Sequence, residues 1–273
     1  VKCTGEDYFA FESTTENATV TFSSSTTSEG YLDITTAGYN KFFKDITPAY
    51  DGITHFDQTS VYTNEYYYHI RKSPWTGNGT EDDPYLISTT TDLKTMSSYA
   101  YQGIVLNHYF KLNNDIDWSQ ETSAFNSIGR RYDNYRIYSF NGTFDGNNKT
   151  ISNLTSENGL FNYVMNGGSI KNLTLTGCTV TGGSTGEDAA GLVADFRSSG
   201  KIENCSVKNS SITNNNYTNI TSAGGIVGYM TNGTIDNCSI EDVTITMSGS
   251  PTYKQCAGGI VGQRSHLAVV PLL

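Results

Sequence analysis

The chain has 273 residues, of which 16% are charged, and its formal net charge is −10. An acidic surface repels phosphate backbones, so this balance argues against nucleic-acid binding, and the apolar runs are too short to form a transmembrane helix. The 27 glycines and 19 tyrosines, together with abundant Ser, Thr and Asn, favour a β-rich protein that is secreted or placed at a cell surface.

The first 72 residues contain short stretches of strand-forming residues separated by turn residues. These stretches are 9–12, 18–22, 31–34 and 61–70. Because each is short and bounded by turn residues, we expect a small antiparallel β-sheet or sandwich over residues 1–72. Residues 73–83, which contain Pro and several Gly, are expected to form a linker.

Residues 84–158 are expected to lead into a larger β structure and to carry its N-terminal cap. Thr89 and Asp92 have the spacing of a helix capping box, and Leu93 and Met96 follow at helical spacing. The first coil of a β-helix otherwise exposes an open core and unpaired strand edges. We therefore predict a short helix that covers this end.

A segment rich in arginine and tyrosine, just after residue 129, is the main candidate for a contact surface. Exposed aromatic rings stack on sugar rings or anchor protein interfaces, and arginine is also enriched in such anchors. The binding candidates are Arg130, Arg131, Tyr132, Tyr135 and Trp75. Other notable aromatic residues are Tyr66, Tyr67, Tyr68, Tyr99, Tyr101 and Tyr138. A plain solvated loop is the alternative interpretation of the segment.

Internal repeats dominate the second half of the chain. Similar segments start at Gly159, Gly191, Gly225 and Gly259, so the period is 32 to 34 residues. Apolar residues recur in the columns Ile170/Ile202/Ile235, Leu173/Cys205/Cys238, Leu175/Val207/Ile240 and Val180/Ile212/Ile245. Because the nearest similar strand lies a full repeat away, like stacks on like and the sheets must be parallel. The sequence therefore predicts a right-handed parallel β-helix whose repeats cover residues 159–263.

An asparagine recurs in the pattern Ile-x-Asn-(Leu/Cys) beside these strands. The apolar spacing there is three and then two, so the chain must bend, and asparagine tolerates the left-handed conformation that such a bend requires. The stacked amides would also bond with one another from coil to coil. We expect structural repeat residues at Asn153, Asn172, Asn204, Asn237, Gly191, Gly225 and Gly259.

The five cysteines are Cys3, Cys178, Cys205, Cys238 and Cys256. They include no CxxC pair, which argues against a zinc site. Cys205 and Cys238 share a column, and neighbouring strands lie about 4.8 Å apart, so distance permits a disulfide. Parallel side chains in register seldom present the required torsion, so two stacked core thiols are the preferred interpretation. Cys178 and Cys256 fall in other columns and are expected at the surface.

The repeats resemble the GLUG motif of surface proteins from gut and oral bacteria, of the Bacteroides adhesin-like type. The motif strings lie at 159–161, 190–194, 223–228 and 257–262, and the matching lead-in lies at 79–88 and 140–151. The resemblance covers roughly residues 77–263, and Asn162 and Ala194 replace the second glycine of the motif. It implies a secreted or surface-attached β-helix, often in adhesin-like or fimbria-associated proteins. It implies no catalytic site and supplies no functional residues.

A polysaccharide lyase or glycoside hydrolase on the same fold is the main alternative. The candidate carboxylates are Asp82, Asp83, Asp115, Asp117, Asp145, Asp188 and Asp195, and the candidate bases are Arg130, Arg131 and Arg197. Asp115 and Asp117 lie two apart on a predicted strand, whereas Asp145 lies in a turn. The histidines are His55, His69, His108 and His266, which lack metal-ligand spacing. We therefore predict no catalytic residue, metal or cofactor.

Together these features predict a non-catalytic extracellular or cell-surface scaffold. Its β-helix would present loops to a glycan or to a protein of a host or bacterial surface. A structural spacer within a longer surface protein is a second alternative, because residues 264–273 do not continue the repeat and resemble an irregular tail of a truncated array. Membrane attachment would require a removed or lipidated N-terminus, for which Cys3 is available.

Overall fold

The computed structural model describes most of the chain. The described residues are 8–13, 18–23, 31–37, 57–62, 65–71, 74–103, 106–132, 136–182, 188–215, 221–248 and 255–265. They belong to two compact units, Val1–Gly79 and Thr80–Leu273, which we describe separately. No helix within these ranges is long and apolar enough to cross a membrane.

Unit Val1–Gly79 consists of antiparallel strands. β1 (Tyr8–Ser13) pairs with β5 (Glu65–Arg71), which also pairs with β4 (Asp57–Tyr62). β2 (Ala18–Ser23) pairs with β3 (Tyr31–Ala37). β1, β2 and β3 fall on predicted stretches, whereas the predicted stretch 61–70 is divided between the end of β4, which begins at Asp57, and β5. The antiparallel pairing is as expected.

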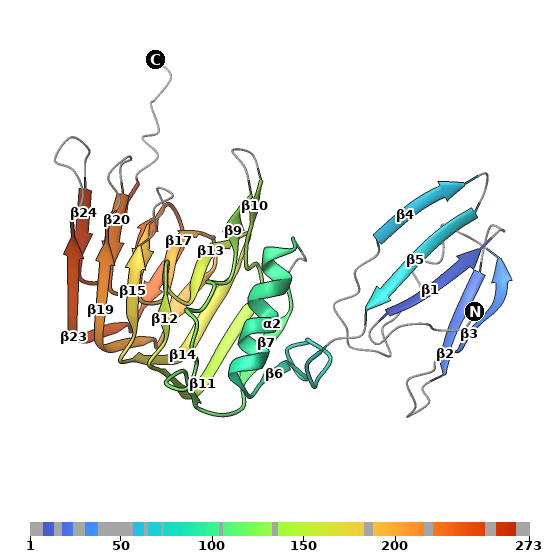
Figure 1. The fold of residues 1–273 in the computed structure, drawn as a ribbon, viewed down its shortest axis with the longest axis horizontal. Coiled ribbons are helices and arrows are strands. Elements are labelled where there is room, and N and C mark those ends of the chain that lie inside the picture. Colours follow the sequence, from blue (N-terminus) through green and yellow to red (C-terminus); the bar gives the residue numbers. More distant parts are fainter. Residues whose placement is uncertain are drawn as a thin grey trace, which may run out of the picture. The chain divides into compact units, whose positions relative to one another are not determined.

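Unit Thr80–Leu273 begins with strand β6 (Tyr85–Ile87) and helix α2 (Thr90–Tyr101), which lies at one end of a solenoid beside β7 (Tyr109–Leu112) (Figure 1). The predicted capping box is present. The Asp92 backbone N–H donates to the Thr89 hydroxyl oxygen (3.2 Å), and the Asp92 carboxylate accepts from the Thr89 backbone N–H (2.9 Å). The buried face of the helix consists of Leu93, Met96, Ser97 and Ala100.

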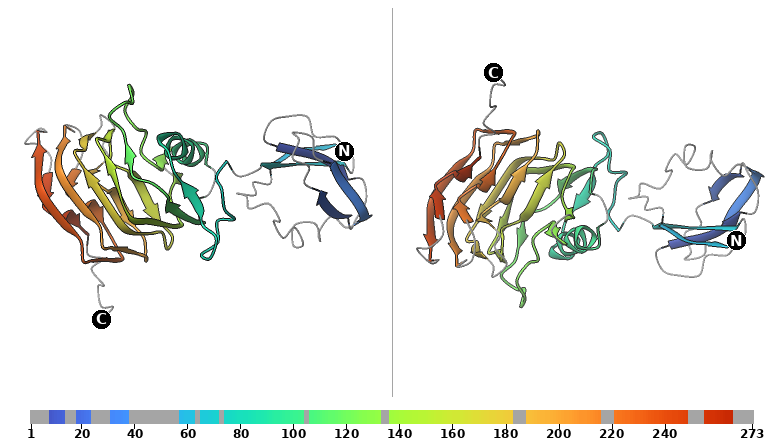
Figure 2. Two further views of the ribbon diagram at one scale, coloured as in Figure 1. Left: turned by 90° about the horizontal axis from the view of Figure 1, so that it is seen from below. Right: turned by 90° about the horizontal axis from the view of Figure 1, so that it is seen from above.

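All the remaining strands except the two of one hairpin stack into three sheets along the solenoid (Figures 1 and 2). The largest sheet adds to β6 and β7 the strands β8 (Ile116–Asp117), β11 (Thr143–Ser152), β12 (Thr155–Ser156), β14 (Ser169–Thr176), β15 (Thr179–Gly182), β18 (Lys201–Glu203), β19 (Ser206–Asn214), β22 (Thr234–Asp236) and β23 (Ser239–Met247). The second contains β13 (Phe161–Met165), β17 (Val193–Arg197), β21 (Val227–Met230) and β25 (Val261–Arg264), and the third contains β16 (Ala189–Ala190), β20 (Thr221–Gly224) and β24 (Gln255–Gly258). All pairings within these sheets are parallel, so the solenoid is the predicted parallel β-helix.

The strand register confirms the predicted apolar columns. The paired columns are Ile170/Ile202/Ile235, Leu175/Val207/Ile240 and Val180/Ile212/Ile245. Their members on β14, β15, β18 and β19 are fully buried. The coils nearest α2 instead fill the core with aromatic rings, such as Phe110 and Phe140, whose centroids lie 5.9 Å apart.

Each repeat bends at two left-handed corners, where the sequence predicted one. Asn172, Asn204 and Asn237 have φ of 54°, 52° and 47° and form the predicted amide ladder. The Asn204 amide donates to the Asn172 side-chain oxygen (3.1 Å), and the Asn237 amide donates to that of Asn204 (2.7 Å). Their side chains therefore stabilise the stacking of successive coils as well as the bend.

Asn153 does not belong to that ladder. It follows Ser152, which pairs with Thr176, and it therefore stands beside Gly177. Positive φ values mark this second corner at Asn153, Gly177, Asn209 and Asp242. The expected shared column was wrong because Phe144, not Ile151, pairs with Ile170; Ile151 pairs with Leu175, so the Ile-x-Asn of β11 lies further along the coil. Asn153 is still a corner residue, but of the other corner.

Glycines stack where successive coils approach most closely. The Gly191 N–H donates to the Gly225 carbonyl oxygen (3.2 Å), and the Gly225 N–H donates to that of Gly259. A Cβ on Gly191 would lie 2.5 Å from the Gly225 oxygen, and one on Gly225 would lie 2.4 Å from the Gly259 oxygen. No side chain fits this column, so the repeat requires glycine there.

The cysteines of the solenoid are thiols in this structure. Cys205 is buried and Cys238 is half-buried, one coil further along. Cys178 is buried, not exposed as expected, because it lies inside the corner between β14 and β15, where its N–H donates to the Ser210 hydroxyl (3.0 Å). Cys256 is half-buried on β24. Cys3 and the tail 266–273 lie outside the described residues.

Candidate binding surface

A β-hairpin projects from the solenoid close to the C-terminal end of α2 (Figures 1 and 2). Its strands β9 (Arg130–Arg131) and β10 (Ile137–Tyr138) pair antiparallel, while Ile128 and Phe140 on either side join the parallel ladder. The chain leaves the coil at Gly129, where φ is 93° and a Cβ would lie 2.9 Å from a backbone oxygen of β10. The predicted contact segment is thus an insertion anchored to the coil on both sides.

Arg130 lies among three tyrosine rings. Its guanidinium carbon is 3.6 Å from the ring centroid of Tyr101, 4.9 Å from that of Tyr132 and 5.5 Å from that of Tyr138. The Tyr132 ring also lies 4.4 Å from the guanidinium carbon of Arg136. Such cation–π contacts hold a guanidinium against a ring while its N–H groups stay available for other partners. We call these five residues the arginine–tyrosine cluster.

The cluster contains unusually exposed aromatic rings. Tyr101 and Tyr132 are 51% and 50% exposed, and no other large hydrophobic side chain is exposed in the described residues of unit Thr80–Leu273. Tyr101 ends α2, and the chain turns away at Gly103, whose φ is 82°. A Cβ on Gly103 would lie 2.9 Å from the Tyr138 ring, so glycine is needed for the hairpin to approach the helix.

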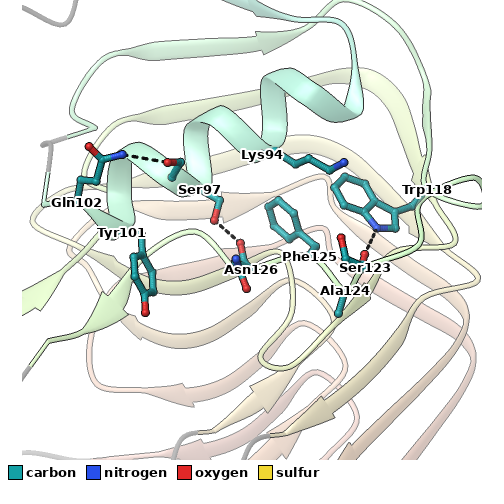
Figure 3. A pocket seen from close by; sticks show the side chains of 10 residues that line it. Lys94, Ser97, Tyr101, Gln102, Trp118, Ser123, Ala124, Phe125 and Asn126 are labelled. Carbon is teal, nitrogen blue, oxygen red and sulfur yellow. Dashed lines mark hydrogen bonds between the residues drawn. The ribbon is translucent and has the colours of Figure 1, made fainter.

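A groove of about 350 Å³ adjoins the cluster, between α2 and residues 118–126 (Figure 3). Its lining includes Lys94, Ser97, Tyr101, Trp118, Phe125 and Asn126. The Ser97 hydroxyl donates to the Asn126 carbonyl oxygen, and the Trp118 indole N–H donates to a backbone oxygen (3.2 Å). These bonds hold the two walls of the groove. Because Tyr101 lines the groove and also contacts Arg130, the groove and the cluster form one continuous surface.

Cationic side chains line this surface, and one carboxylate lies beside them. Lys94 forms an ion pair with Glu121, which lowers the Glu121 pKa, and its ammonium group is 5.4 Å from the Trp118 ring centroid. Arg130 and Arg131 form no ion pair with any carboxylate of the described residues, and Arg130 Nε makes no hydrogen bond with them. An arginine-rich surface with exposed rings can recognise a ligand by stacking and hydrogen bonding.

The structure brings together some of the predicted binding residues and separates others. Arg130, Arg131 and Tyr132 share the hairpin. Tyr135 lies outside the described residues. Trp75 is only 4% exposed, so the expectation that it offers a contact surface was wrong; it is a core residue. Sequence reasoning noted Tyr101 as an aromatic but did not place it beside Arg130, because nothing in a non-repeating segment links residues so far apart.

Three candidate catalytic carboxylates act as structural acceptors instead. Asp117 accepts from the Asn153 amide (2.8 Å), and this bond together with those from a neighbouring serine lowers the Asp117 pKa to about 2. Asp145 accepts from the Asn172 amide (3.0 Å) and so begins the asparagine ladder. Asp115 likewise accepts from a backbone N–H (2.8 Å). These bonds account for the three residues without catalysis.

Two further candidate carboxylates, Asp188 and Asp195, lie just before β16 and on β17. The Arg197 guanidinium donates twice to the Asp195 carboxylate (2.8 and 2.6 Å), which neutralises that charge. Asp188 accepts from the backbone N–H and the hydroxyl of Ser222 (2.7 and 2.6 Å), and burial raises the Asp188 pKa to about 6. No group of three or more His, Cys, Asp or Glu side chains in the described ranges is arranged to hold a metal ion.

Comparison with known proteins confirms the resemblance found in the repeats. The sequence model of the GLUG motif matches residues 219–246, so the chain carries this motif. Over 197 residues, 71% of this chain, it is 30% identical to halomucin of Haloquadratum walsbyi, and it spans only 2% of that protein. Among solved structures, a candidate immunoglobulin A1 protease from Bacteroides ovatus aligns with a TM-score of 0.39 and 18% identity, over 70% of this chain and 75% of that one. That structural likeness is too weak to carry an argument about function.

Proposed function

We propose that this GLUG-motif chain is a non-catalytic scaffold at the cell surface that binds glycans through the arginine–tyrosine cluster. The observation that carries the proposal is the exposure of Tyr101 and Tyr132 on either side of Arg130. In the described residues of unit Thr80–Leu273, no other large hydrophobic side chain is exposed. Rings exposed at one place in this unit are typical of a contact surface.

The scaffold part of the proposal is supported by the construction of the solenoid. Parallel ladders, stacked glycines and the asparagine ladder fix each coil on the next one, so the hairpin is presented from a laddered base. A site on such a base needs little reorganisation when it binds. The surface location is supported by the composition, by the GLUG motif and by the likeness to halomucin.

The proposal is tested with a glycan array on the purified chain and on the double variant Tyr101→Ala/Tyr132→Ala. We expect specific binding by the parent chain and a loss of about tenfold per removed ring, which corresponds to about 1.4 kcal/mol each. Thr244→Ala, an exposed position on β23, serves as the matched control and should bind as the parent does. A parent chain that binds no glycan would refute glycan recognition and would favour a structural spacer.

A carbohydrate-active enzyme is the second candidate, and the raised pKa of Asp188 is the observation in its favour. A carboxyl group that keeps its proton near pH 6 can act as a general acid, and Asp195 lies near enough for its charge to raise that pKa further. The test is release of reducing sugars from mixed plant and host polysaccharides. Release by the parent chain that disappears in Asp188→Asn would establish the enzyme and overturn the non-catalytic scaffold.

A further inference from the structure

The charge of the arginine–tyrosine cluster indicates which glycans it takes. Three of the six arginines of the chain, Arg130, Arg131 and Arg136, lie within seven residues of sequence, although the chain as a whole has a net charge of −10. The described part of the hairpin contributes no carboxylate to neutralise Arg130 or Arg131. The described part of the hairpin is therefore a positive surface on an acidic protein, and it will attract anions selectively.

We propose that the cluster and its groove bind an acidic saccharide, that is, a sugar chain carrying carboxylate or sulfate groups; this inference rests on the proposed glycan-binding function. The exposed faces of Tyr101 and Tyr132 would stack on sugar rings, and the guanidinium of Arg130 between them would pair with the acidic group. Guanidinium N–H groups match the two oxygens of a carboxylate or a sulfate, whereas a neutral hydroxyl offers no such charge.

The position of Arg130 makes it the specificity-determining residue. Three rings surround its guanidinium, and ring stacking holds a guanidinium without using its N–H groups. Its Nε atom is buried without a hydrogen-bond partner among the described residues, so a ligand oxygen would meet the terminal N–H groups of the guanidinium. A fixed, incompletely bonded guanidinium beside two exposed rings is a preorganised anion site rather than a flexible surface charge.

The groove extends this site along α2. It meets the cluster at Tyr101 and carries the Lys94 ammonium group and the Trp118 ring near its other side (Figure 3). Its volume of about 350 Å³ lies within the range of small-molecule sites. A second sugar residue of a chain bound at Arg130 would therefore find an aromatic wall in the groove, beside a Lys94 ammonium group that is already paired with Glu121.

The test measures binding of the full chain to an oligogalacturonate, to its methyl ester and to a sulfated heparin-type oligosaccharide by titration calorimetry. We expect the free acid or the sulfated chain to bind at least tenfold more tightly than the neutral ester, and that preference to shrink as salt is raised. The carboxylate and sulfate arms show which acidic group is preferred.

Two variants of Arg130 distinguish the effect of its positive charge on binding from that of its planar guanidinium. Arg130→Gln should weaken acid binding about tenfold and abolish the preference over the ester, while Arg130→Lys should keep part of that preference. Arg264→Gln, an exposed arginine on β25, is the matched control and should change nothing. An unchanged thermal midpoint for each variant shows that the fold is intact. Equal binding of acid and ester by the parent chain would overturn the acidic-saccharide proposal and leave glycan binding standing, whereas no binding of any saccharide would refute both.

Discussion

The first and the last described coils of the solenoid differ in how far their core side chains are buried. At the first end α2 lies over the coil, and aromatic residues such as Tyr85 and Phe110 are fully covered. At the other end the last described coil carries the same apolar columns, but Ile235, Ile240 and Ile245 are only half-buried. A position in the repeat therefore has no fixed burial: it is buried when coils or a cap lie on both sides of it. In a stacked array most stability comes from such nearest-neighbour contacts.

Because burial falls toward the last described coil, alanine variants at two positions of one apolar column should lose very different amounts of stability. Ile202→Ala removes a fully buried side chain between two coils and should lower the free energy of unfolding by about 2–5 kcal/mol. Ile235→Ala, one coil further along, should cost about half as much, because its side chain is already partly solvated. Urea unfolding of both variants measures the contrast, and equal losses would show that burial does not fall toward the last coil.

Variants of the asparagine ladder should also lose less stability toward the last described coil, and the difference should be smaller than in the apolar column. Asn204→Ala loses ladder bonds to the coils on both sides and places alanine at a φ of 52°, which should cost about 1–3 kcal/mol. Asn237→Ala loses only the bond to Asn204 and should cost less. Asn204→Gly is the control, because glycine accepts this φ and isolates the contribution of the amide. A glycine variant as stable as the parent would mean that the ladder contributes nothing.

The N-cap hydrogen bond of α2 should contribute less to the free energy of unfolding than a buried core side chain does. Thr89→Ala removes the hydroxyl that accepts the Asp92 N–H, and the expected loss is about 1 kcal/mol. Hydrogen exchange should show faster opening of α2 and of the neighbouring β6 and β7, with β23 unchanged. Faster exchange spread evenly over all coils would contradict the assignment of α2 as a local cap.

The reactivity of the cysteines should fall as their burial rises. A hydrogen bond from Cys205 lowers the pKa of Cys238, while burial raises that of Cys178 to about 11. Because the thiolate is the reactive form, alkylation of Cys238 should begin at a lower pH than that of an ordinary thiol, and Cys178 should stay unlabelled in the folded chain. Mass-spectrometric mapping of iodoacetamide labelling measures both. Labelling of Cys178 at the rate of Cys238 would show that its corner is open.

The repeating part of this fold could be predicted from the sequence, and the non-repeating part only in outline. Columns such as Ile170/Ile202/Ile235 are visible because stacking demands similar residues at one period. Asn153 was assigned to the wrong corner because residues 151–153 match the Ile-x-Asn pattern, although Ile151 pairs with Leu175 and not with Ile170. The contact of Tyr101 with Arg130 depends on where α2 ends and how the hairpin leaves the coil. Composition could not reveal that Trp75 is buried, because an aromatic ring suits a core and a surface equally.

The most direct test of the whole account is a hydrogen-exchange footprint of the chain with and without an oligogalacturonate. If the cluster at the capped end is the binding surface, protection should appear in the C-terminal turn of α2 and in β9 and β10, and β21, β23 and β25 should exchange as before. Protection of the last described coil, with the hairpin unchanged, would place the ligand away from the cluster and contradict the account.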